Sequence, residues 1–169
     1  LMDQVAFVFQ NNRLFKASVL DNVRAARPDA SREQILAALE AAQCGDILEK
    51  LPQGLDTVIG TEGTYLSGGE AQRIALARAI LKDAPIVVLD EATAFADPEN
   101  EALIQKAFAR LTKDRTVIMI AHRLSTVVGA DKILVLEGGR VTEQGTHEEM
   151  IAAGGLYTRM WADYNQAIQ

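Results

Sequence analysis

The sequence has few of the features that mark disulfide-rich, membrane-spanning or nucleic-acid-binding proteins. Its single cysteine, Cys44, has no partner for an internal disulfide, and we expect a small buried hydrophobic side chain in a reducing compartment. The longest apolar runs, such as IVVL and VIMIA, are far shorter than the roughly 18–20 residues of a membrane-spanning helix. Because 17 Lys and Arg stand against 23 Asp and Glu, we expect no basic face for nucleic acid or anionic lipid.

A phosphate-binding loop is also missing. No glycine is followed by lysine, whereas nucleotide-binding loops of the Gly-Lys-Ser/Thr type use that pair to cradle phosphates. The chain opens with LMDQVAFVF, which has neither the order of a signal peptide nor the signals of a helix start. This opening leads us to expect a longer polypeptide from which an upstream part is absent.

What the sequence does contain is the make-up of one soluble α/β domain. Its 169 residues are 49% hydrophobic and 24% charged, which suffices for a sizeable core. Short β-branched runs alternate with helix patterns in the second half of the chain, and this predicts a parallel sheet. Residues 17–84 carry mainly helix signals, including a capping box at Ser31 and Gln34, and predict a helical subdomain inserted into that core.

The segment LSGGE predicts a helix with an unusual first turn. Ser67 suits the N-cap, and Glu70 stands where it can bond back to that cap. Gly68 and Gly69 would each weaken a helix interior by about 1 kcal/mol, so their presence needs a reason. A turn without side chains lets an oxyanion reach free backbone N–H groups and the positive end of the helix dipole. The alternative is a merely capped helix, and these letters alone leave both open.

A second helix start and two arginines complete the helix signals. Asp97 suits an N-cap and Pro98 the first helical position, which predicts a helix running to about Leu111. Arg73 and Arg78 lie on the helix that begins after LSGGE, and we interpret them as structural or salt-bridging residues.

Polar side chains follow three predicted strands. The run IVVLD predicts a strand buried on both faces, and it places Asp90 and Glu91 at the sheet edge where α/β proteins bind ligands. One acid can hold Mg²⁺ while the next orients or deprotonates a water, although a solvated strand end is the alternative. The run TVIMIAH predicts a second buried strand ending in His122, which can contact a phosphate or a water but is by itself more typical of a structural residue. Gln10 ends the first strand in the same way.

Taken together and in order, Gln10, LSGGE, IVVLDEAT, Asp97 and His122 resemble the nucleotide-binding domain of an ABC transporter, from Leu1 to about Trp161. The resemblance implies an α/β fold with an incomplete P-loop NTPase-like parallel sheet core, formed by residues 1–16 and 85–169. Residues 17–84 would form the helical subdomain. It also implies these roles: Glu91 the catalytic base, His122 the switch histidine, Gln10 the Q-loop glutamine, Asp90 the Walker B aspartate, Asp97 the D-loop aspartate, and Ser67, Gly68 and Gly69 the signature.

The same resemblance implies the ligands and partners. The cofactors would be ATP and Mg²⁺, with Asp90 and Gln10 contacting the metal. In such domains two copies pair head to tail, and the signature of one closes over the ATP held by the phosphate loop of the other. The helix after Ser67 would therefore await the γ-phosphate of a partner, and the missing loop would lie before Leu1. Alone, the fragment would bind ATP poorly or not at all.

The final third of the chain is similar to exporter-type half transporters, in which a transmembrane domain precedes this one on the same chain. This would place the domain at the cytoplasmic face of the membrane. The stretch DEATAFADPENE resembles a bacterial branch that includes siderophore and drug transporters, while GTEGTY lacks the acid–arginine pair usual in exporters. Two alternatives stay open: a DNA-repair or chromosome-structure ATPase, disfavoured because Gln10 and Ser67 stand too close for a long coiled coil, and a non-hydrolytic dimerisation module.

Overall fold

The structure, a computed structural model, describes residues 2–9, 13–90 and 98–168. They fall into two compact units, Leu1–Ile120 and Ala121–Gln169, and each unit is described by itself. The predicted division, a core of residues 1–16 and 85–169 with a helical subdomain of residues 17–84, cuts the chain at other places and stays a prediction.

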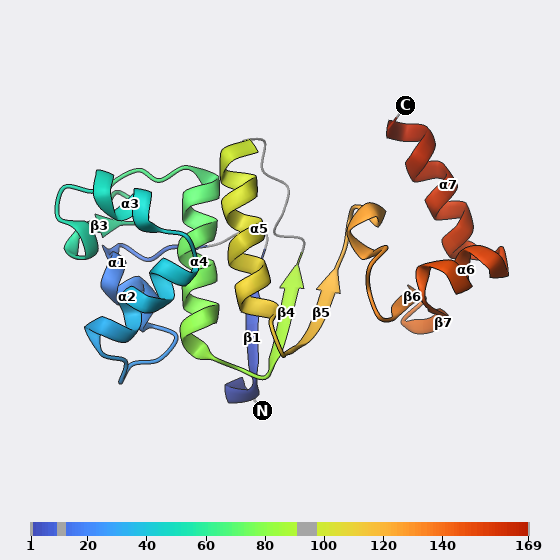
Figure 1. The fold of residues 1–169 in the computed structure, drawn as a ribbon, viewed down its shortest axis with the longest axis horizontal. Coiled ribbons are helices and arrows are strands. Elements are labelled where there is room, and N and C mark those ends of the chain that lie inside the picture. The colour runs from blue at the N-terminus through green and yellow to red at the C-terminus, as the bar shows by residue number, and fades with distance from the viewer. Residues whose placement is uncertain (1, 10–12, 91–97, 169) are drawn as a thin grey trace. The chain divides into compact units, whose positions relative to one another are not determined.

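The first unit is built on a parallel three-stranded sheet (Figure 1). Its strands are, in spatial order, β1 (Val5–Val8), β4 (Ile86–Asp90) and β5 (Thr116–Ile120). Val5 pairs with Ile86, and Ile86 in turn pairs with Thr116, so the three strands start level with one another. The short 3-10 helix η1, Met2–Gln4, precedes β1. The parallel pairing confirms the α/β core that the alternation of strands and helices predicted.

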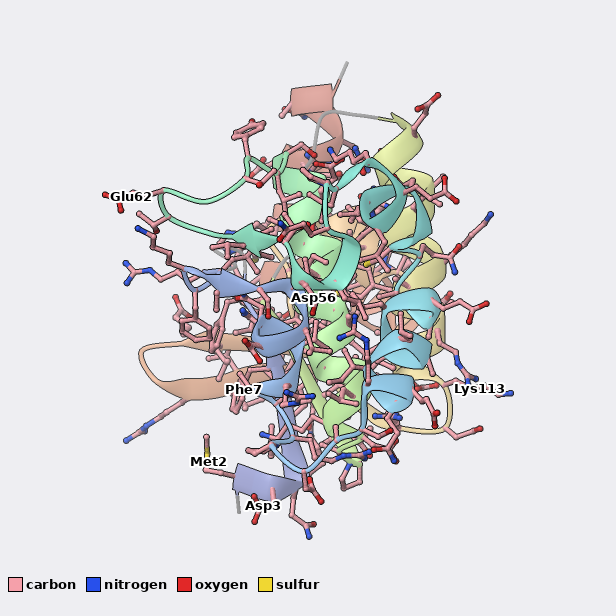
Figure 2. All side chains as sticks on the ribbon, turned by 90° about the vertical axis from the view of Figure 1, so that its left-hand side faces the viewer. Met2, Asp3, Phe7, Asp56, Glu62 and Lys113 are labelled. Carbon is pink, nitrogen blue, oxygen red and sulfur yellow. The ribbon has the colours of Figure 1, made fainter. Side chains whose placement is uncertain are left out.

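Two helices, α4 (Gly68–Lys82) and α5 (Pro98–Thr112), cover one face of this sheet (Figure 1). The strand residues that point toward them are at most 3% exposed, namely Ala6, Val8, Val87 and Leu89. Alternate strand residues point the other way, because successive side chains of a strand face opposite sides of the sheet. Phe7, on β1, is 41% exposed on that other side (Figure 2).

The strand β5 contradicts the expectation of a second buried strand. All five of its residues are exposed, and Ile118 is 53% and Ile120 52% accessible. The strand β4 is also less buried than predicted, because Ile86 and Val88 are only half-buried. The reason is position: β5 ends the described sheet, and within the described part of the first unit no strand pairs with its second edge. An apolar run predicts side chains that can be buried, but whether they are buried depends on which other segments pack against them.

The helical part of the first unit lies against the side of α4 that faces away from the sheet. Its helices are α1 (Val19–Arg24), α2 (Arg32–Ala41) and α3 (Gly45–Lys50). The capping box predicted at Ser31 and Gln34 is present at the start of α2. Cys44 is completely buried between α2 and α3, and burial raises the pKa of its thiol to about 12, which confirms its interpretation as a small hydrophobic residue.

One small element was not predicted. The strands β2 (Ala17–Ser18) and β3 (Val58–Ile59) pair antiparallel, and the 3-10 helix η2 (Gly54–Asp56) precedes β3. Such two-residue strands depend on a distant partner and leave no local pattern. The loop that follows β3 extends outward to Glu62, whose carboxylate lies 2.7 Å from the Lys16 ammonium (Figure 2).

The second unit is a hairpin packed on two helices. Its elements are η3 (Leu124–Val127), β6 (Ile133–Glu137), β7 (Arg140–Gly145), α6 (His147–Ala153) and α7 (Leu156–Ile168). The hairpin turn contains Gly138 and Gly139, which both have positive φ, 56° and 76°. The capping box at Thr146 and Glu149 is also present. In neither unit does a described helix combine the length and the apolar character needed to span a membrane.

Candidate functional site

The first turn of α4 is capped as the sequence predicted. The Ser67 side-chain oxygen accepts a hydrogen bond from the Glu70 N–H at 3.2 Å, and the Glu70 carboxylate accepts one from the Ser67 N–H at 2.8 Å. The Ala71 N–H bonds to the Ser67 carbonyl oxygen. The N–H groups of Gly68 and Gly69 have no acceptor among the described residues. Because the Ser67 oxygen acts here as an acceptor, its O–H remains a donor for a further group.

The two glycines differ in their surroundings. Gly68 is exposed, so its bare backbone is open to a ligand. Gly69 is buried, and a Cβ placed on it would lie 2.8 Å from both Cβ and Cγ of Asn100 on α5. Helix packing therefore requires a glycine at position 69. Packing against Asn100 thus gives Gly69 a second reason to lack a side chain, while the explanation that both glycines admit an oxyanion stays a prediction.

Glu70 forms an ion pair in addition to its hydrogen bonds in the capping box. It is 9% exposed, and the Lys50 ammonium forms an ion pair with its carboxylate. Burial by itself would raise the pKa of Glu70, but the hydrogen bonds from Lys50 and Ser67 outweigh burial and leave the pKa lowered. The carboxylate is therefore ionised and fixed at the start of the helix, where the helix dipole also favours negative charge.

Arg73 is the centre of a buried hydrogen-bond network below the first turn. It is 1% exposed, and its two terminal nitrogens lie 2.6 and 2.9 Å from the Asp46 carboxylate oxygens. One of these nitrogens also donates to the Gln43 carbonyl oxygen, and the other donates to Asn100 Oδ1 at 2.9 Å. The hydrogen bond from Arg73 lowers the pKa of Asp46. This confirms the structural interpretation of Arg73. Its partners Gln43, Asp46 and Asn100 are too distant along the chain for a local sequence pattern to predict them.

Arg78 has a structural role at the other side of α4. Its guanidinium donates to the Asn22 carbonyl oxygen at 2.7 Å and to the Arg13 carbonyl oxygen at 2.8 Å. It also lies 5.0 Å from the centre of the Phe15 ring, within the range of a cation–π contact. Arg78 thus joins α4 to α1 and to the segment that follows β1.

Asp90 stands where the sequence predicted it, at the end of a parallel strand. It is the last residue of β4 and is half-buried. The helices α4 and α5 begin at the same end of the layer at which β4 ends (Figure 1). The starts of α4 and α5 and the carboxylate at the end of β4 therefore share one edge of the first unit, the edge at which parallel α/β sheets bind ligands.

The other candidate residues are divided between the second unit and the undescribed positions. His122 belongs to the second unit, is exposed, and follows the end of β5 by two residues. Gln10, Glu91 and Asp97 lie outside the described residues. Within residues 2–9, 13–90 and 98–168, no group of three or more His, Cys, Asp or Glu side chains is placed to hold a metal ion. Within the first unit, the described candidate residues that share one end are therefore the signature and Asp90.

A cavity of about 430 Å³ lies at the opposite end of α4, away from Ser67. It is bordered by α2 and by the last turns of α4 and α5, and its charged side chains include Arg27, Asp83 and Arg115. Arg115 is already paired with Asp83 at 2.6 Å. The cavity contains none of the candidate site residues and is separate from the edge at which β4 ends.

Comparison with known proteins identifies relatives for nearly the whole chain. The sequence model of the ABC transporter family matches residues 1–94. A mycobactin import ATP-binding/permease protein of Mycobacterium tuberculosis is 53% identical over 161 residues, which are 95% of this chain and 19% of that protein. An ATP-dependent lipid A-core flippase of Neisseria meningitidis is 49% identical over 160 residues, which are 95% of this chain and 26% of that protein.

A solved structure also resembles this chain over nearly its whole length. It is that of a bacterial Atm1-family ABC exporter with ATP bound, and it superposes with a TM-score of 0.84 and 42% identity. The match covers 95% of this chain and 28% of that one. The chain therefore spans about a fifth to a quarter of the length of the proteins that it resembles.

Proposed function

Since this chain belongs to the ABC transporter family, we propose that it is part of an ATP-binding domain whose ATP hydrolysis powers the movement of a solute across a membrane. The observation that carries the proposal is the shared edge of the first unit. There the capped start of α4, with Ser67 and the exposed Gly68, lies at the same end as Asp90 (Figure 1). Because the chain spans only part of the length of its relatives, we propose that the activity is that of a longer, full-length protein.

The start of α4 is assigned to a phosphate of ATP held by a second nucleotide-binding domain. The Gly68 and Gly69 N–H groups and the Ser67 O–H are donors at the positive end of a 15-residue helix. A γ-phosphate supplies the acceptors that these donors lack. In this assignment Gly68 admits the phosphate, while Gly69 contributes its N–H and leaves room for α5.

We assign the two acidic residues Asp90 and Glu91 to the hydrolysis of ATP. Asp90 would hold Mg²⁺, which neutralises phosphate charge when it is bound and typically keeps several waters beside one or two carboxylates. A single described carboxylate at a half-exposed strand end fits that requirement. Glu91 would accept a proton from the water whose oxygen bonds to the γ-phosphorus as the bond to ADP breaks. Gln10 and His122 would contact the attacking water or the γ-phosphate, Gln10 would also contact the metal, and Asp97 would face the second domain.

The uncovered sheet supports a shared nucleotide site. Parallel sheets in α/β proteins are covered on both faces, yet β5 is exposed along its whole length and Phe7 is 41% exposed. We assign the missing cover, together with the loop that cradles the phosphates, to a further part of the full-length protein. On this view the present chain contributes the closing helix and the hydrolytic acids of the nucleotide site.

We propose the partners and the location from the resemblance to ABC transporters. A second nucleotide-binding domain, identical or related, would pair head to tail with this one, and a transmembrane domain would place both at the cytoplasmic face of the membrane. We assign the cargo to the siderophore or drug class, which the 53% identity to a mycobactin import protein supports. The lipid A-core flippase at 49% identity is the nearest competing cargo class among these relatives.

ATPase measurements on the purified full-length protein test the proposal. Glu91→Gln should lower kcat by at least about 100-fold, because a positioned general base contributes about 10²- to 10⁴-fold. Glu101→Gln, at an exposed position of α5, is the matched control and should hydrolyse ATP like the parent. Absence of ATP hydrolysis in the parent, or near-parent turnover in Glu91→Gln, contradicts the proposed function.

A further inference from the structure

The first turns of α4 and α5 are joined at one residue, Asn100. Its Oδ1 accepts a hydrogen bond from the Arg73 guanidinium at 2.9 Å. Its Cβ and Cγ occupy the space that a side chain at position 69 would need, since both lie 2.8 Å from an ideal Cβ on Gly69. Asn100 thus touches α4 through both a hydrogen bond and a close packing contact.

The contacts of Arg73 on its other side restrict movement at this junction. The guanidinium is 1% exposed and is held from the other side by the Asp46 carboxylate and the Gln43 carbonyl oxygen. A buried guanidinium has no water to replace a lost partner, so withdrawing Asn100 would leave one of its donors with Asp46 alone. The planar fork of arginine also fixes the direction in which the acceptor must lie.

Two candidate site residues are close to this junction along the chain. Ser67 caps α4 directly before Gly68, and α5 begins at Pro98, directly after Asp97. A lock between the first turns of the two helices therefore ties together the chain segments that carry Ser67 and Asp97. Movement of one helix start relative to the other would have to break the bond between Arg73 and Asn100.

We propose that Asn100 is a positioning residue, which through Arg73 and Gly69 makes the starts of α4 and α5 one rigid body. Ser67 and Asp97 then reach the second nucleotide-binding domain together. The inference rests on the proposed function and adds a residue to which that function assigns no role. Asn100 touches neither nucleotide nor water in this scheme, and its effect passes entirely through the placement of Ser67 and Asp97.

Substitutions at position 100 in the full-length protein separate this role from simple packing. Asn100→Leu keeps Cβ and Cγ but removes the acceptor, and it should lower kcat about tenfold, because small misplacements of reacting groups are costly. The KM for ATP should stay within about twofold of the parent, since the loop assigned to cradle the phosphates is not affected. Asn100→Asp restores an acceptor of the same shape and should recover most of kcat. Glu101→Gln, one residue further on, should leave kcat unchanged.

A second background tests whether Asn100 acts through Asp97. Once Asp97→Ala has removed one of the two positioned groups, adding Asn100→Leu should lower kcat by clearly less than it does in the parent, because only the displacement of Ser67 then remains and effects through one shared element are not additive. The inference is overturned if Asn100→Leu keeps parent kcat, if Asn100→Asp is as impaired as Asn100→Leu, or if the loss is equal in both backgrounds. These outcomes differ from failure of the proposed function, in which the parent itself would not hydrolyse ATP or Glu91→Gln would remain active.

Discussion

The helix α4 and the strand β5 are both rich in apolar residues, but they are opposites in the structure. Ten residues of α4 are buried, including the polar side chains of Glu70, Gln72 and Arg73. All five residues of β5 are exposed, although four of them are Val, Ile or Met. The helix lies between α1, α2, α5 and the sheet, whereas β5 has a described partner along one edge only.

The contrast shows that burial is a property of neighbours. An apolar side chain stabilises the fold only when another surface removes it from water, by about 25 cal/mol per Å² of apolar surface buried. Other segments surround α4, so even the charged side chain of Arg73 can be buried against Asp46 and Asn100. Within the described part of the first unit β5 pairs with a strand along one edge only, and its Ile118 and Ile120 are exposed. Three predictions, in decreasing size of effect, sharpen or break this comparison.

The largest expected effect is that of truncating a side chain in each element. Leu76 on α4 is completely buried, and Leu76→Ala should lower the free energy of unfolding by about 2–5 kcal/mol, because it removes buried methyl groups and leaves a cavity. Ile118→Ala on β5, which is 53% exposed, should change it by less than about 1 kcal/mol. Urea unfolding of the 169-residue chain measures both.

The same pair in the full-length protein tests whether β5 has a cover there. Ile118→Ala should then lower the thermal midpoint clearly, and the difference from Leu76→Ala should shrink. Equal losses for the two variants in the 169-residue chain would break the comparison, because they would mean that β5 is already covered.

An intermediate effect is expected from the two glycines at the start of α4. Gly69→Ala should cost about 1–3 kcal/mol, since the new Cβ would lie 2.8 Å from Asn100 Cβ. Gly68→Ala should change stability by less than about 1 kcal/mol, because position 68 is exposed and alanine favours the helix. In the full-length protein Gly68→Ala should nevertheless lower the ATPase rate. A stable Gly69→Ala chain would show that packing against α5 does not require this glycine.

The smallest effect is a change in acid sensitivity. The hydrogen bond from Arg73 lowers the pKa of Asp46 in the folded chain. A lowered folded pKa means that the carboxylate stabilises the fold above its unfolded pKa of about 3.9, and that this stabilisation is lost as the pH falls through the folded value. Asp46→Asn should therefore show a shallower loss of stability than the parent between about pH 5 and pH 3.

Urea unfolding midpoints across that pH range measure the acid effect. Asp163→Asn, at an exposed position of α7, is the control and should follow the parent. A parent and an Asp46→Asn variant with parallel acid limbs would show that Asp46 does not stabilise Arg73 in its buried position.

Local signals predicted the start of α4 well. The capping box of Ser67 and Glu70 needs only residues three positions apart, and the structure contains it. The reason for Gly69 could not be predicted in the same way, because the atoms that exclude a side chain there belong to Asn100, on another helix. The pairing of β2 with β3 was missed for the same reason.

The sequence by itself determined the capped helix starts, the strands of the parallel sheet and the order of the candidate residues, because capping, glycine geometry and apolar runs act over a few neighbouring positions. It also sufficed to identify the family. The tertiary structure decided which apolar residues are buried, why Gly69 must be a glycine, and that Arg73 joins Asp46 to Asn100. These depend on segments distant along the chain that fill the same space, and that information lies in packing and not in any local pattern.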